Sequence, residues 1–228
     1  MNISGFEKLT LLDFPGKIAC IVFTQGCNYK CKFCHNSSLI STNNQKYSEK
    51  EIFDYLEKRK NILDGIVISG GEPTLCKDLK KFIKKVKKMG LLVKLDTNGT
   101  NPKILKELID EKLIDYIAMD IKNSFSCYEK IVGVKNTFID NIKESIDIIK
   151  NSNLEHEFRT TIMKEHHNIE SLKEICRYIG KDEKYYLQNF RISDCVIDKS
   201  LTPFDNQELS NIEKILNKEF PNACVRGA

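Results

Sequence analysis

The feature that most constrains this fold is a regular alternation of apolar runs with amphipathic runs along the chain. Six apolar runs predict buried strands, and the amphipathic runs between them predict helices. The strands are expected at residues 18–24, 65–69, 91–95, 114–121, 155–163 and 184–190. Strands that alternate with helices form a parallel sheet. The sequence therefore predicts an α/β fold, either an open sheet or a partial barrel of six strand–helix units.

Capping patterns mark several of the expected helices, which fall at residues 48–60, 79–88, 101–111, 141–150, 171–178 and 205–219. Ser48 and Glu51 have the spacing of a capping box, and Asn101 followed by Pro102 is typical of a helix start. The lysines of residues 77–88 fall opposite an apolar helical face, which indicates a solvated surface. A short apolar segment at residues 223–225 predicts an added edge strand.

The length fits one large domain or two small ones, and because no linker rich in Gly, Ser or Pro divides the chain we expect a single domain over residues 1–228. The chain has 41% hydrophobic and 30% charged residues, which is ordinary for a globular protein. No run of about 18 apolar residues could span a membrane, and the N-terminus does not read as a signal peptide. The net charge of +4 arises from interspersed acids and bases, which disfavours nucleic-acid binding. We expect a cytoplasmic protein without a membrane or nucleic-acid partner.

Three of the nine cysteines form a C-x3-C-x2-C motif at Cys27, Cys31 and Cys34, directly after the first expected strand. An odd number of cysteines without an export signal disfavours a disulfide framework. Thiolates at this spacing can converge on one metal centre, and three are one fewer than the four that saturate a [4Fe–4S] cluster. Two alternatives stay open on spacing alone. One is a zinc site with His35 as fourth ligand, which its adjacency to Cys34 disfavours; the other is buried thiols without metal.

Four further polar motifs lie where expected strands end: residues 69–73 (SGGEP), 96–99 (DTNG), 120–122 (DIK) and 188–191 (QNFR). Each alone could be an ordinary turn. The glycines of SGGEP could let the backbone approach a ligand, and Glu72 could accept a hydrogen bond from an ammonium group. The active sites of β/α folds lie at the carboxyl ends of the strands. Five motifs from five strands therefore predict one cofactor site at that edge.

Together these motifs resemble those of radical S-adenosylmethionine (SAM) enzymes. Residues 13–16 (DFPG), 23–28 (FTQGCN) and 34–36 (CHN) narrow the resemblance to the activating enzymes of glycyl radical enzymes. The motifs are most similar to the anaerobic ribonucleoside-triphosphate reductase activating type, a relative of pyruvate formate-lyase activase. The resemblance extends over residues 3–191, and it implies the family fold, a partial (β/α)6 barrel of the TIM-like type.

The resemblance implies a [4Fe–4S] cluster and SAM as cofactors, with Cys27, Cys31 and Cys34 as the cluster ligands. The residues that it places at the SAM site are Phe33, Cys34, His35, Gly70, Gly71, Glu72, Asp96, Thr97, Asp120, Lys122 and Asn189. Asp96 and Thr97 match positions that help to hold a monovalent cation in the formate-lyase activase. Asn189 stands in a loop where that activase has a histidine near SAM.

The implied activity is that of an oxidoreductase. Reductive cleavage of SAM would give a 5′-deoxyadenosyl radical, which would abstract a hydrogen atom from a glycine of a partner glycyl radical enzyme. A flavodoxin or ferredoxin is the expected electron donor. Two rivals stay open: a small-molecule radical SAM enzyme, such as the 7-carboxy-7-deazaguanine synthase type, and a non-catalytic iron–sulfur or zinc module. The DFPG and CHN strings favour the activating enzyme over the first rival, and the strand-end motifs argue against the second.

Overall fold

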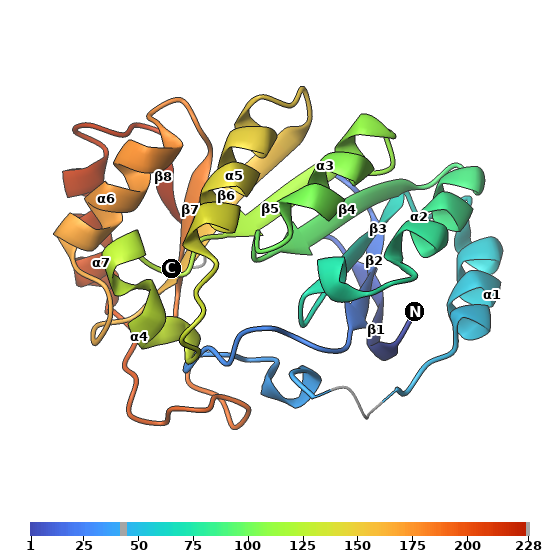
Figure 1. The fold of residues 1–228 in the computed structure, drawn as a ribbon, viewed down its shortest axis with the longest axis horizontal. Helices are drawn as coiled ribbons and strands as arrows, with labels where there is room; N and C mark the ends of the chain where they lie inside the picture. The colour runs from blue at the N-terminus through green and yellow to red at the C-terminus, as the bar shows by residue number, and fades with distance from the viewer. Residues whose placement is uncertain (42–44, 227–228) are drawn as a thin grey trace.

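The computed structural model describes residues 1–41 and 45–226, and an eight-stranded sheet forms its centre (Figure 1). The strands are β1 (Ile3–Thr10), β2 (Ala19–Thr24), β3 (Gly65–Gly70), β4 (Leu92–Thr97), β5 (Tyr116–Asp120), β6 (Glu155–Ile162), β7 (Tyr185–Asn189) and β8 (Ala223–Arg226). Their order in the sheet follows their order in the chain. Strand β1 is antiparallel to β2, and every later neighbouring pair is parallel.

All six predicted strands are confirmed as β2 to β7, and the predicted edge strand is confirmed as β8. The apolar residues of β2 and β3 are almost completely buried, as expected for parallel strands covered on both faces. Strand β1 was not predicted. It is an edge strand with the polar residues Glu7 and Lys8 exposed, and its pairing with β2 is irregular near Gly5, so it carries neither an apolar run nor a regular alternation.

Helices follow the outer side of the curved sheet from α1 to α7 (Figure 1). They are α1 (Glu49–Arg59), α2 (Leu79–Lys88), α3 (Pro102–Asp110), α4 (Tyr128–Val132), α5 (Ile139–Lys150), α6 (Ile169–Ile179) and α7 (Asn206–Leu216). The six predicted helices are confirmed, and the single-turn α4 was not predicted. The capping box of Ser48 and Glu51 forms as expected. Asn101 stands at the N-cap position of α3, but its side chain donates to the Thr74 carbonyl instead of capping the helix.

The lysine-rich α2 has the predicted two-faced character. Leu79, Phe82, Ile83 and Val86 are buried against the sheet. The lysines lie on the other side, where two of them, Lys80 and Lys84, pair with Glu111 beyond α3. The lysine run is therefore a solvated helix face with local ion pairs.

The sheet curves into a partial barrel. Strands β1 and β8 are its two edges, and among residues 1–41 and 45–226 no strand pairing joins them. This arrangement confirms the expected open barrel and leaves the carboxyl ends of β2 to β7 along one rim. None of the helices in the same residues is both long and apolar enough to cross a membrane.

Candidate functional site

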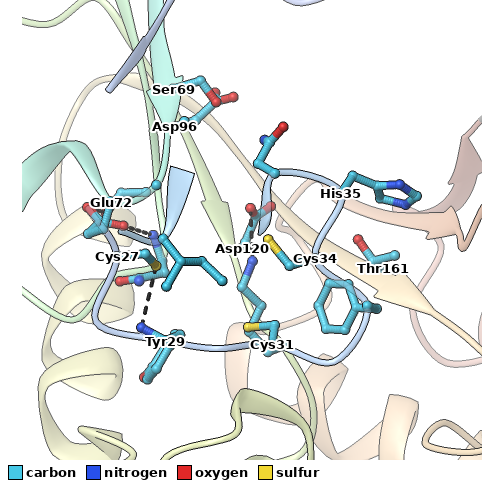
Figure 2. A pocket seen from close by; sticks show the side chains of 18 of the residues that line it. Cys27, Tyr29, Cys31, Cys34, His35, Ser69, Glu72, Asp96, Asp120 and Thr161 are labelled. Carbon is cyan, nitrogen blue, oxygen red and sulfur yellow. Dashed lines mark hydrogen bonds and ion pairs between the residues drawn. The ribbon is translucent and has the colours of Figure 1, made fainter. Parts of the chain in front are cut away.

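A cavity at the carboxyl ends of the strands brings together all but one of the predicted site residues (Figure 2). It is lined by Cys27, Cys31, Phe33, Cys34, His35, Gly70, Gly71, Glu72, Asp96, Thr97, Asp120 and Lys122. These residues come from the ends of the three strands β3, β4 and β5 and from the loop after β2. The strand-end motifs that were expected to form one site therefore meet at one cavity, apart from the motif at β7, where a different residue enters the cavity.

The loop that carries the three cysteines is held by backbone hydrogen bonds at its start and near its middle. Gly26 N donates to the Leu39 carbonyl over 2.8 Å. Lys30 N donates to the carbonyl of Val132 at the end of α4 over 2.9 Å. Gly133 follows α4 at a φ of +68°, and a Cβ there would lie 2.5 Å from the Lys30 carbonyl oxygen. The helix α4, which was not predicted, thus supports the cysteine loop through backbone contacts.

The donor set of this loop fits a [4Fe–4S] cluster with one open iron. Figure 2 shows Cys27, Cys31 and Cys34 on a single loop at the cavity. Among the described residues that line the cavity, these three are the only cysteines, one fewer than a saturated cluster needs. Burial raises the pKa of Cys27 to about 11 and that of Cys31 to about 12. Both are protonated thiols at neutral pH, so binding iron as thiolates would release protons.

Glu72 is fully buried at the turn after β3. Its Oε1 accepts hydrogen bonds from the Thr74 amide (3.0 Å), the Thr74 hydroxyl (2.6 Å) and the Thr97 hydroxyl (2.8 Å), while Oε2 accepts from the Asn98 amide (2.7 Å). Burial is the largest influence on this carboxyl and raises its pKa. Four donors of the chain itself already occupy the group, which ties the end of β3 to the end of β4.

The two glycines of the same turn allow a close approach of backbone to backbone. A Cβ on Gly71 would lie 2.2 Å from the Gly26 carbonyl oxygen, and one on Gly70 would lie 2.4 Å from both N and O of Thr24. Glu72 N also donates to the Gly26 carbonyl over 2.8 Å. The glycines were predicted to admit a ligand; in the structure they admit the start of the cysteine loop.

Charged side chains of three strands meet at the floor of the cavity. Arg159 of β6 donates from Nε to Asp120 (2.8 Å), and its Nη2 lies 3.4 Å from Asp96. Lys122 donates to the other oxygen of Asp120 over 3.2 Å, which confirms that the two charged residues of DIK point the same way. Burial raises the pKa of Asp120, but the positive charges of Arg159 and Lys122 outweigh burial and bring it down to about 2. Asp120 is therefore ionised throughout the neutral range.

Aromatic rings border the cysteine loop. The Lys122 ammonium lies 5.7 Å from the centre of the Phe33 ring, which is almost fully buried. The ring of His35 lies 5.6 Å from that of Phe190, and its Nδ1 lies 3.2 Å from the Ser193 hydroxyl. These rings offer flat apolar faces beside the charged floor, a combination that suits a ligand with a planar base and a charged tail.

Asn189 is the one predicted residue that the structure does not bring to the cavity. Its side chain is held outside by both backbone groups of Phe204, at 2.8 and 3.0 Å. Side chains alternate along a strand, so the neighbouring Gln188 lines the cavity instead. The sequence interpretation selected the correct strand end but the wrong face of β7.

Two residues of β6, Arg159 and Thr161, also line the cavity and were not predicted. A signal for them exists in the sequence. Strand β6 carries Glu157, Arg159 and Thr161 at every second position, whereas a parallel strand covered on both faces is expected to be apolar throughout. A polar alternation in such a strand indicates a polar interior facing a site.

Comparisons with known proteins show the family of this chain. Residues 21–179 match the model of the Radical SAM superfamily. A Methanocaldococcus jannaschii protein, provisionally named a glycyl-radical enzyme activating enzyme, is 34% identical over 98% of this chain and 95% of its own. The pyruvate formate-lyase-activating enzyme of Clostridium pasteurianum is 30% identical over 82% of this chain and 80% of its own.

Solved structures share the fold at low sequence identity. Streptococcus suis SuiB bound to S-adenosylmethionine superposes with a TM-score of 0.70 at 16% identity, over 91% of this chain and 50% of that chain. QueE from Escherichia coli superposes with a TM-score of 0.54 at 16% identity, over 98% of this chain and 91% of its own. The family match implies a [4Fe–4S] cluster and SAM as cofactors. The chain thus belongs to the radical SAM superfamily, among the glycyl-radical enzyme activating enzymes.

Proposed function

We propose that this protein activates an anaerobic ribonucleoside-triphosphate reductase by generating a glycyl radical on it. The observation that carries the proposal is the cavity in which the three-cysteine loop faces charged side chains from β4, β5 and β6. Relatives named as glycyl-radical or formate-lyase activating enzymes support a protein substrate. The similarity of the combined DFPG, FTQGCN and CHN motifs to the reductase-activating type supports the reductase as the partner.

Cys27, Cys31 and Cys34 are the proposed ligands of the [4Fe–4S] cluster. A cluster held by these three thiolates would supply one electron for the reductive cleavage of SAM, the chemistry by which a hydrogen atom would be taken from glycine. Backbone hydrogen bonds to Leu39 and Val132 fix the cysteine loop, so its three sulfur atoms have defined positions. Rigid placement of a cofactor against its substrate is the main contribution of the protein in such reactions.

The charged floor suits the methionine part of SAM. That part is zwitterionic, with an ammonium and a carboxylate, and the floor holds fixed charges of both signs. Asp120 stays ionised, and although burial lowers the pKa of Lys122, the charge of Asp120 outweighs it and raises that pKa, so Lys122 stays protonated. We assign Asp120 and Lys122 to contacts with SAM, and Phe33 and His35 to the walls beside its adenine.

A monovalent cation beside Asp96 and Thr97 does not fit the residues present. Asp96 already accepts from the buried Lys94 ammonium over 2.7 Å and lies 3.4 Å from Arg159. The Thr97 hydroxyl donates to Glu72 and accepts from the Gly99 amide. The negative charge at Asp96 is thus balanced by side chains of the chain, and we derive no step through a cation.

The open barrel supports a large partner. Strands β1 and β8 leave the rim incomplete, so a glycine-bearing loop of a folded protein could reach the cavity from the side. A reduced flavodoxin or ferredoxin is the electron donor that we propose. The nine cysteines are free thiols, which supports a reducing compartment such as the cytoplasm.

The test is to look for the radical on the partner. The purified protein, loaded with iron and sulfide under anaerobic conditions, is incubated with SAM, a reductant and the anaerobic reductase, and the sample is examined by electron paramagnetic resonance (EPR). We expect the doublet of a glycyl radical, absent when Cys31→Ala replaces the wild type. A radical on pyruvate formate-lyase but not on the reductase would reassign the partner. SAM cleavage with no radical on either protein would favour a small-molecule substrate.

A further inference from the structure

A row of charged side chains with alternating sign runs through the interior of the barrel, from the cavity towards the opposite end of the strands. Lys122 pairs with Asp120, Asp120 with Arg159, and Arg159 lies 3.9 Å from Glu157. Glu157 in turn accepts two hydrogen bonds from the Arg226 guanidinium, at 3.0 and 2.8 Å. This row of ion pairs therefore connects the edge strand β8 to the floor of the site.

Arg159 is the centre of this row, because its three side-chain nitrogen atoms face three different carboxylates. Nε faces Asp120, Nη2 faces Asp96 and Nη1 faces Glu157, at 2.8, 3.4 and 3.9 Å. The side chain is only 12% exposed. A planar guanidinium presents its donors in fixed directions, which the single ammonium of lysine does not.

Arg159 reduces the electrostatic repulsion between two carboxylates of the site. Asp96 and Asp120 lie on the neighbouring strands β4 and β5, and both side chains line the same cavity. Two half-buried carboxylates that line one cavity repel each other unless a cation lies between them. Lys94 and Lys122 each neutralise one of the two, whereas Arg159 contacts both and so links their positions.

Glu157 is almost completely buried and is held in turn by β8. Besides Arg226, it accepts a hydrogen bond from the Tyr116 hydroxyl over 3.1 Å. The Arg226 guanidinium carbon lies 3.6 Å from the centre of the Tyr186 ring, which fixes the orientation of that guanidinium. The carboxylate of Glu157 is therefore immobilised from below, and it limits where Arg159 can lie.

We propose that Arg159 is a positioning residue of the SAM site, which holds Asp96 and Asp120 in register, and that the Glu157–Arg226 pair fixes Arg159 from the far end of the barrel. The inference rests on the proposed function, since it takes SAM as the ligand of the cavity. Arg159 acts through Asp120 and Asp96. Its loss is therefore expected to weaken SAM binding without removing the cluster.

The experiment compares Arg159→Met and Arg159→Lys with the wild type as iron-loaded enzymes. SAM affinity is measured by titrating SAM against the EPR spectrum of the reduced cluster, and iron content is measured in parallel. We expect Kd to rise about tenfold or more in Arg159→Met, equal to about 1.4 kcal/mol of binding free energy, with iron content unchanged. Lysine should restore only part of the affinity. Added ethylguanidinium should restore affinity to Arg159→Ala, whose truncated side chain leaves room for it, but leave the wild type unaffected.

Matched variants separate the possible failures. Lys87→Met breaks a similar half-buried pair, with Asp115 outside the cavity, and should leave SAM affinity unchanged. Arg226→Gln should raise Kd by a smaller factor, about two- to fivefold, through Glu157. If Arg159→Met folds poorly, Arg159→Lys and Arg226→Gln decide the question.

Unchanged affinity in Arg159→Met or Arg159→Lys would overturn the positioning role. Unchanged affinity in Arg226→Gln would overturn the contribution of β8. Loss of affinity that ethylguanidinium does not restore would show a general structural defect and also count against the inference. A wild-type cluster whose spectrum does not respond to SAM would instead contradict the proposed function.

Discussion

The hydroxyl of Thr97 donates a hydrogen bond to Glu72 across 2.8 Å and so links the ends of strands β4 and β3 directly beneath the cavity. The same carboxylate accepts from both the amide and the hydroxyl of Thr74 and from the Asn98 amide. With no exposed surface and four donors around it, Glu72 organises two strand ends as well as lining the site.

Replacement of Glu72 by alanine should therefore reduce stability strongly. Glu72→Ala leaves the buried amides of Thr74 and Asn98 without acceptors and opens a cavity beside them. Each buried unsatisfied group costs about 1–3 kcal/mol, so we expect the free energy of unfolding to fall by about 3 kcal/mol or more. Urea unfolding of the metal-free chain measures the change. Glu107→Ala on the exposed side of α3 is the control, and an equal effect of both substitutions would refute the structural role.

Alanine at Gly71 should disrupt the backbone contact that positions the start of the cysteine loop. A Cβ there would meet the Gly26 carbonyl oxygen at 2.2 Å, and neither backbone segment can withdraw without moving Cys27. We expect Gly71→Ala to lose both stability and iron binding. Gly90→Ala has a positive φ of +79° but no atom within 4 Å of the new Cβ, so it should cost stability, by about 1 kcal/mol, and keep full iron binding. Equal iron contents in the two variants would show that the close approach is unimportant.

Removal of a single cluster ligand should remove the iron. Cys31→Ala leaves two thiols on the loop, and we expect the anaerobically reconstituted variant to lose most of the iron, sulfide and visible absorption of the wild type. Cys195→Ala removes an exposed thiol outside the cavity and should retain all three. Zinc bound in place of iron, with the same dependence on Cys31, would instead support a structural metal site.

The stability of the protein should depend on pH through His167. Its Nε2 donates to the Lys122 carbonyl at 3.1 Å and its Nδ1 accepts from the Met163 amide at 3.3 Å, so the ring is held neutral. Burial is the main cause that lowers the pKa of His167 to about 4. The unfolded chain, with a pKa near 6.5, takes up this proton first.

The stability contributed by neutral His167 is therefore complete above about pH 6.5 and is lost as the pH falls from there towards 4, by about 3 kcal/mol in total. The check is urea unfolding of the metal-free chain at several pH values. His167→Gln should be less stable at pH 7 and should show a shallower decline between pH 6.5 and 4. Carboxylates contribute equally to both proteins, so parallel curves would contradict the role of His167.

The sequence contains enough information for the parallel part of the sheet because its strands are buried on both faces and read as apolar runs. The pattern of apolar runs does not reveal an element that is exposed or very short. Strand β1 is an edge strand with Glu7 and Lys8 exposed, and the single turn of α4 is too short to show a helical period. Both elements owe their form to tertiary contacts, β1 to its pairing with β2 and α4 to its bonds with the cysteine loop.

For the site, motif and strand-end position predicted which side chains would gather, but could not say which face of a strand they occupy. A shift of one residue exchanges Asn189 for Gln188, because side chains alternate along β7. Arg159 was missed because it stands in mid-strand, away from any turn. Its role depends on long-range partners, Asp96 and Asp120, whose distances only the folded chain defines.

The measurement that tests the central claim most directly is the production of 5′-deoxyadenosine. The wild type and Cys31→Ala are treated with iron and sulfide, reduced with dithionite under anaerobic conditions and given SAM, and the product is quantified. We expect the wild type to form 5′-deoxyadenosine and Cys31→Ala to form none. A wild type that binds zinc in place of iron and forms no 5′-deoxyadenosine would contradict radical SAM chemistry in this protein.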